Sequence, residues 1–187
     1  MAAPCWSRVG GAPCSDRVTS AASGLTKGVL CLPVSGPPPG ITWPVASNPM
    51  ARTPPRLTHF LQTEKPARVL IPGCGSGYEV RAFHDAGWEV LAIDYTAAAV
   101  ERARVELGEL AGHVQLADFF SFDAPAVELI YERAFLCALP RHLWLDYAAR
   151  VGELLRPGGR IAGFYFFSDE LRGPPFGLAA GQLTSRS

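Results

Sequence analysis

The chain has 187 residues, a formal net charge of zero and only 18% charged residues. This length is typical of one domain of ordinary size. A balanced charge lacks the positive patch expected of a protein that binds nucleic acid or an anionic membrane, so neither partner is predicted. Five scattered cysteines without a Cys-x-x-Cys pair, and four histidines without ligand spacing, predict neither disulfides nor a metal site.

The sequence predicts neither a membrane span nor a secretory signal. No apolar run approaches the roughly 18 residues that would span a bilayer. Residues 1–10 lack the basic and then apolar order of a secretory signal. We therefore expect a cytoplasmic protein, with its cysteines reduced.

Residues 1–52 differ in composition from the rest and are rich in Gly, Pro, Ser and Ala. The run Pro-Pro-Pro-Gly at 37–40 cannot hold a helix or a central strand. We predict a low-complexity, disordered arm. Its one apolar island, residues 29–34, could instead add an edge strand.

From Thr53 onward, short apolar runs alternate with helical patterns. The runs predict strands at 69–71, 90–93, 114–117, 127–131 and 161–167. The helical patterns lie at 78–86, 96–107 and 141–155, and a further helix begins at Thr53, which is followed by two prolines. Such alternation predicts an α/β fold with a doubly wound, mostly parallel sheet, as in Rossmann-like proteins.

A glycine turn follows the first of these strands. Gly73, Gly75 and Gly77 alternate where the chain must bend and let a ligand approach its backbone. The dinucleotide fingerprint needs a sixth-position glycine, but those positions hold Tyr78 and Val80. The spacing therefore favours a nucleoside ligand without a pyrophosphate.

Asp94 ends the second strand of this unit, at the edge of the sheet where such ligands bind. Its carboxylate could accept both hydroxyls of a ribose. The alternative is an ordinary helix N-cap, since a helical pattern begins at Thr96.

Four segments resemble a known family. Residues 69–79 resemble the first motif of S-adenosylmethionine-dependent methyltransferases, and more narrowly that of the thiopurine S-methyltransferase-like group. Residues 130–135, 138–140 and 173–177 are similar to later segments of the same group. The resemblance implies a methyltransferase domain at 53–177, followed by a flexible tail at 178–187, with S-adenosylmethionine as the cofactor.

The resemblance also implies the site. It assigns cofactor binding to Ile71, Gly73, Cys74, Gly75, Gly77, Asp94, Tyr95, Asp118, Phe119 and Arg133. Within this set, Asp118 and Phe119 would hold the adenine, although Asp118 could instead cap a turn with Ser121. Arg133 would face the acceptor as the catalytic residue, although it could instead form a surface pair with Glu132.

Cys74 also has two interpretations. A thiol on a glycine turn near a helix N-terminus could be a nucleophile with a lowered pKa. A methyl donor needs no covalent enzyme intermediate, so we favour a role for the Cys74 backbone.

The predicted function is S-methylation of a small-molecule thiol. The alternative is a truncated, catalytically silent relative that binds the cofactor, because the family's first segment and last strands are not recognisable. Without those strands, residues 161–167 would form an open sheet edge, so we predict a dimer through this strand.

Overall fold

The computed structural model describes residues 28–33, 53–168 and 172–179. Six parallel strands form one sheet in the order β1-β6-β5-β2-β3-β4. The strands are β1 (Gly28–Pro33), β2 (Arg68–Pro72), β3 (Glu89–Asp94), β4 (Val114–Leu116), β5 (Val127–Arg133) and β6 (Leu155–Tyr165). Helices lie in the crossovers from β2 to β3, from β3 to β4 and from β5 to β6, whereas residues 117–126 join β4 to β5 without a helix.

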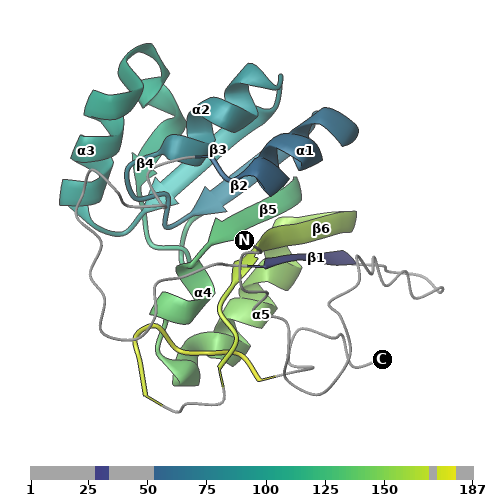
Figure 1. The fold of residues 1–187 in the computed structure, drawn as a ribbon. Helices are drawn as coiled ribbons and strands as arrows, with labels where there is room; N and C mark the ends of the chain where they lie inside the picture. Colours follow the sequence, from purple (N-terminus) through teal and green to yellow (C-terminus); the bar gives the residue numbers. More distant parts are fainter. Residues whose placement is uncertain (1–27, 34–52, 169–171, 180–187) are drawn as a thin grey trace, which may run out of the picture.

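Helices cover both faces of this sheet (Figure 1). The α-helices are α1 (Pro55–Thr63), α2 (Tyr78–Asp85), α3 (Ala97–Leu107), α4 (Phe135–Ala138) and α5 (Trp144–Leu154), with 3-10 turns η3 (Gly108–His113) and η4 (Arg141–Leu143). Helices α1 to α3 lie on one side, and α4 and α5 lie on the other. This confirms the predicted doubly wound α/β fold.

Two hydrophobic cores follow from this layering. One joins α1, α2 and α3 to the sheet through residues such as Leu57, Phe83 and Leu107. The other joins α4 and α5 to the opposite face, where Leu70 and Ile130 meet Tyr147. Central strands bury both faces, which is why they appear in the sequence as continuous apolar runs.

Three local predictions need correction. The helix predicted at 141–155 begins with η4, and its α-helical part starts only at Trp144. The strand predicted at 161–167 begins earlier, at Leu155, so the Pro-Gly-Gly run at 157–159 lies inside β6, where pairing with β5 shifts register between Val127 and Leu129. A bulge of this kind absorbs extra residues without ending the strand. Helix α4 was not predicted, because four residues are too few to show a helical period.

The strand expected at the open edge is covered. Strand β1 pairs with β6 in parallel from Gly28↔Arg160 to Pro33↔Tyr165. The prediction that β6 is an edge is therefore wrong, because the apolar island of the N-terminal arm supplies its neighbour. The rest of that arm lies outside the described residues.

Removing this neighbour should make the protein associate. We expect a chain lacking residues 1–52 to form dimers or larger species, because the unpaired main chain of β6 can then accept another strand. Size-exclusion chromatography over a range of concentrations measures this. A chain lacking only residues 1–27 keeps β1 and serves as the control. Equal elution behaviour, after allowance for mass, would contradict the expectation.

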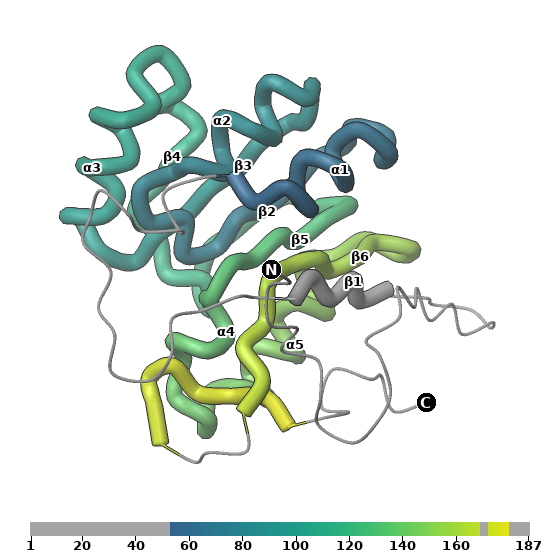
Figure 2. Tube along the Cα trace, in the orientation of Figure 1, coloured from purple at the N-terminus to yellow at the C-terminus, as the bar shows by residue number. Residues whose placement is uncertain are grey.

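The C-terminal segment 172–179 packs back on the domain. The Phe176 N–H donates to the carbonyl of Cys137 in α4 at 2.7 Å, and Arg141 donates to the Gly177 carbonyl at 2.8 Å. Figure 2 shows this segment, in yellow, passing beside α4. Leu178 is buried and bridges to Phe167, so the tail predicted to begin at 178 still belongs to the core at that residue.

No helix within the described ranges is long and apolar enough to cross a membrane.

Candidate functional site

The glycine turn joins the carboxyl end of β2 to α2. Gly73, Gly75 and Gly77 have φ angles of 61°, 54° and 76°, a left-handed region that side chains with a Cβ rarely adopt. The Cys74 N–H donates to the Ile93 carbonyl at 3.1 Å, and the Gly77 N–H donates to the Cys74 carbonyl at 2.8 Å. The turn is therefore tied to the end of β3.

Asp94 lies beside this turn, as predicted for the two strand ends. Its Oδ2 accepts from the Gly75 N–H at 3.1 Å, while its Oδ1 accepts from the N–H of Thr96 at 2.9 Å and from its hydroxyl at 3.0 Å. The helix N-cap is Thr96, so the alternative that Asp94 is itself the cap is wrong. The carboxylate instead links the turn to the start of α3.

Exposed apolar side chains flank Asp94. The predicted Tyr95 follows it in the chain and is 77% exposed. Leu116, the Cα partner of Asp94 on β4, is 56% exposed. Sequence reasoning missed Leu116, and its place at the end of a strand beside Asp94 is the signal that could have found it.

Asp118 and Phe119 differ in exposure and in their contacts. Asp118 is exposed, and its Oδ1 accepts from the Phe120 N–H at 3.0 Å. Its backbone carbonyl accepts from Ser121 and Phe122, so Asp118 closes a turn by side chain and main chain together. Phe119 is buried and stacks on the Tyr147 ring at 5.5 Å. The adenine role predicted for both residues remains a prediction.

Arg133, the last residue of β5, pairs with Glu79 in the first turn of α2. The guanidinium Nη1 lies 2.6 Å from Glu79 Oε1, and the two side chains are only 10% and 9% exposed. The alternative surface pair with Glu132 is wrong, because the Glu132 side chain is fully buried elsewhere. Sequence reasoning missed Glu79, since 54 residues separate it from Arg133 and no periodic pattern links them.

Tyr131 contributes a second buried polar group near this pair. Tyr131 is 1% exposed, and its hydroxyl has no hydrogen-bond partner among the described residues. Burial raises the pKa of Tyr131, and the charge of Glu79 raises it further while Arg133 opposes the shift. The hydroxyl therefore stays protonated at neutral pH and can donate.

The side chains of Ile71 and Cys74 are both buried. Ile71 is buried in β2, and Cys74 is 7% exposed. Burial raises the pKa of the Cys74 thiol to about 12, with a further contribution from Asp94. A thiol with this pKa is not a nucleophile at neutral pH, which agrees with the favoured backbone role.

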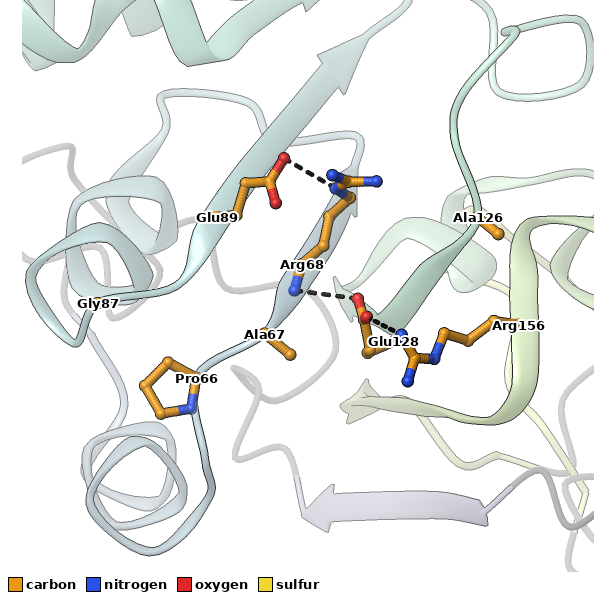
Figure 3. Close-up of a pocket in the computed structure, with 8 residues that line it drawn as sticks. All are labelled: Pro66, Ala67, Arg68, Gly87, Glu89, Ala126, Glu128 and Arg156. Atoms are coloured by element: carbon orange, nitrogen blue, oxygen red, sulfur yellow. Dashed lines mark hydrogen bonds and ion pairs between the residues drawn. The ribbon is translucent and has the colours of Figure 1, made fainter.

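Two hollows in the described part of the chain have no lining from Asp94. One, of about 440 Å³, opens at the amino ends of β2, β3 and β5, on the edge opposite the glycine turn (Figure 3). Its charges are paired within it, Arg68 with Glu89 and Arg156 with Glu128. The other, of about 340 Å³, lies between α2 and α3 and reaches Ser76 and Gly77 from behind.

A parallel sheet of this order, with a glycine turn after β2 and an acid ending β3, is the arrangement of the Rossmann-like class I methyltransferases. The chain belongs to the thiopurine S-methyltransferase family, whose model matches residues 49–185.

Relatives and solved structures agree with this assignment. A probable thiol methyltransferase 2 of Arabidopsis thaliana is 30% identical over 154 residues, covering 75% of this chain and 67% of the relative. A thiopurine S-methyltransferase of Vibrio campbellii is 31% identical over 150 residues, covering 69% of each chain.

Two solved methyltransferases share the fold. The glycopeptide N-methyltransferase MtfA complexed with S-adenosyl-L-methionine has a TM-score of 0.53 at 21% identity, covering 61% of this chain and 54% of its own. A 1,6-didemethyltoxoflavin-N1-methyltransferase of Burkholderia thailandensis, with its namesake ligand and S-adenosylhomocysteine bound, has a TM-score of 0.53 at 25% identity, covering 62% and 52%. The chain thus spans about half of each solved structure.

The residues fit an adenosyl cofactor on one side of the turn. A Cβ placed on Gly75 would meet no atom within 4 Å, so the backbone there is open to a ligand. Asp94 adjoins it, and a carboxylate has more acceptor capacity than its three donors use. On the other side, a Cβ on Gly73 would lie 2.5 Å from Cδ2 of Phe135, so that ring covers Gly73.

Proposed function

We propose that the protein is an S-adenosylmethionine-dependent methyltransferase that methylates a small-molecule thiol in the cytoplasm. The observation that carries the proposal is Asp94 bonded to the open glycine turn at Gly75, in a chain of this family. The names of the Arabidopsis and Vibrio relatives support sulfur as the acceptor atom.

The proposed mechanism needs little acid–base catalysis from the protein. When bound, S-adenosylmethionine supplies a methyl group already activated by its sulfonium charge. Asp94 and the Gly75 main chain would orient the nucleoside, and Tyr95 and Leu116 would exclude water from it. Holding a thiolate in line with the methyl carbon can contribute around 7–11 kcal/mol through proximity alone.

Arg133 is proposed to orient the acceptor. Its guanidinium is held nearly buried by Glu79, and the neighbouring Tyr131 hydroxyl is a protonated donor. The pair is neutral overall, so a thiolate would meet directed N–H donors without a strong net field. A thiolate, which carries one negative charge, therefore fits these groups better than a dianion does.

Methyl transfer is the direct test. Purified protein is incubated with S-adenosylmethionine labelled in its methyl group and a small aromatic thiol, and the labelled thioether is quantified. We expect turnover with the thiol and much less with the matching phenol. Binding of S-adenosylhomocysteine without turnover of any acceptor would favour the catalytically silent alternative, and no binding would reject the proposal.

Asp94→Ala should weaken S-adenosylhomocysteine binding by about 1.5 kcal/mol, or roughly tenfold, because it removes a charged acceptor and releases Gly75. Isothermal titration calorimetry measures the Kd. Asp85→Ala, an exposed acid on α2, is the control and should bind as the wild type does. Equal affinity of Asp94→Ala and wild type would retire the role of Asp94.

Arg133→Lys should lower turnover roughly tenfold, since an ammonium cannot reproduce the planar fork that meets Glu79 and the acceptor. The loss should appear in kcat and in KM for the thiol. Arg102→Lys, on the exposed face of α3, should leave both unchanged. A loss confined to S-adenosylhomocysteine affinity would move Arg133 from the acceptor to the cofactor.

A further inference from the structure

Glu132 is a fully buried carboxylate at the end of β5 that the proposed chemistry does not use. Its Oε2 accepts from the Leu136 N–H at 2.6 Å, and its Oε1 accepts from the Tyr147 hydroxyl at 3.2 Å. These bonds join three elements, β5, α4 and α5. A buried carboxylate bonded in this way holds its partners firmly, because none of them can turn to water instead.

The bond to Leu136 stabilises a strained turn. Ala134, between Glu132 and α4, has a φ of 64°, a left-handed conformation that residues with a Cβ rarely adopt. Such a turn persists only where its surroundings fix it. The Glu132 carboxylate does so by accepting from the first turn of α4.

The turn at Ala134 places Phe135 against the glycine turn. Phe135 is the first residue of α4, and its ring covers Gly73. The same ring lies 6.2 Å from that of Tyr147 and 5.3 Å from that of Phe119. Tyr147 therefore both donates to Glu132 and packs near Phe135, while Phe135 contacts the glycine turn.

We propose that Glu132 is a positioning residue for the cofactor turn: it fixes α4 so that Phe135 presses on Gly73 and sets the shape of the Gly73-to-Gly77 backbone. Glu132 itself touches no ligand. The identity of that ligand rests on the proposed function, but the mechanical coupling from Glu132 to the turn does not.

Amide hydrogen exchange in the cofactor-free protein tests the coupling. Glu132→Leu should speed exchange of the Gly75 and Gly77 amides by roughly tenfold beyond any global loss of stability. Glu132→Gln keeps an acceptor for Leu136 and should retain protection. Val151→Ala, a core truncation on α5, is the control for a purely structural loss. Equal changes in Glu132→Leu and Val151→Ala would overturn the proposal.

A milder variant covers the case in which Glu132→Leu does not fold. Tyr147→Phe removes one donor to Glu132 and keeps the ring, so it should speed the same two amides by a smaller factor. Exchange of these amides at the wild-type rate in Tyr147→Phe, while amides of α5 change, would also overturn the proposal.

Cofactor affinity gives an independent readout. By calorimetry with S-adenosylhomocysteine, Glu132→Leu should bind roughly tenfold more weakly, and Glu132→Gln within about threefold of wild type. Combining Glu132→Leu with Phe135→Leu should add little to either loss, because both variants break one chain of contacts. Additive losses would contradict the coupling. If the wild type fails to bind, the proposed function falls, while amide exchange still decides the positioning role.

Discussion

The contribution of Glu132 to the free energy of unfolding should fall by about 3 kcal/mol as the pH rises from 4.5 to about 7, and Glu132→Gln should remove this contribution. Burial raises the pKa of Glu132 from 4.5 to about 7, although hydrogen bonds from Leu136 and Tyr147 oppose the shift. Among the described residues, Glu132 is the most deeply buried acid.

The direction follows from proton binding. Between pH 4.5 and 7 the folded protein keeps a proton on Glu132 that the unfolded chain has released, so raising the pH favours unfolding. The stability associated with the protonated acid is complete below pH 4.5 and is lost as the pH passes through 7. Glutamine has no proton to lose and should give a flatter profile.

Urea unfolding at pH 5, 6, 7 and 8 measures the difference between wild type and variant, which cancels the contribution of other titrating groups. Glu101→Gln, an exposed acid on α3, should follow the wild-type profile. Parallel profiles for wild type and Glu132→Gln would show that Glu132 titrates in the folded protein as it does in the unfolded chain.

Gly163→Ala should destabilise the protein by more than about 3 kcal/mol, beyond the usual range for adding one methyl group to a core. Gly163 pairs with Glu132 on the neighbouring strand. A Cβ at this position would overlap the Glu132 carbonyl oxygen and lie 2.9 Å from its Cγ. The Glu132 carbonyl belongs to the main chain that the β5–β6 hydrogen bonds hold in place, so moving it away from the new Cβ would disrupt that pairing.

The control is a glycine with space around it. A Cβ on Gly112, in η3, would meet no atom within 4 Å, so Gly112→Ala should change stability by less than about 0.5 kcal/mol. Thermal and urea unfolding compare the two variants. A loss below about 1 kcal/mol in Gly163→Ala would mean that β5 and β6 can separate locally.

Much of the fold could be predicted, because strands that are buried on both faces leave apolar runs in the sequence. Strand β2 is the clearest case, with four consecutive buried residues, and the three alternating glycines after it marked the turn. The contact between Asp94 and Gly75 followed from the rule that adjacent parallel strands end at one edge. These predictions used only local patterns.

The parts that could not be predicted depend on contacts between distant residues. Nothing near Arg133 in the chain indicates that Glu79 is its partner. Phe119 follows a strand end and was assigned to the ligand, but in the structure the rings of Tyr147 and Phe135 surround it. The place of β1 next to β6 is likewise set by pairing and not by its own short apolar run.

The pairing of β1 with β6 also constrains the order of events during synthesis. The two strands lie roughly 130 residues apart in the chain, so β1 leaves the ribosome long before the strand with which it pairs. A ladder between such distant segments contributes heavily to contact order and slows folding. The nascent chain must therefore keep an apolar segment unpaired until nearly the whole domain has emerged, and holding that segment is a task suited to a chaperone.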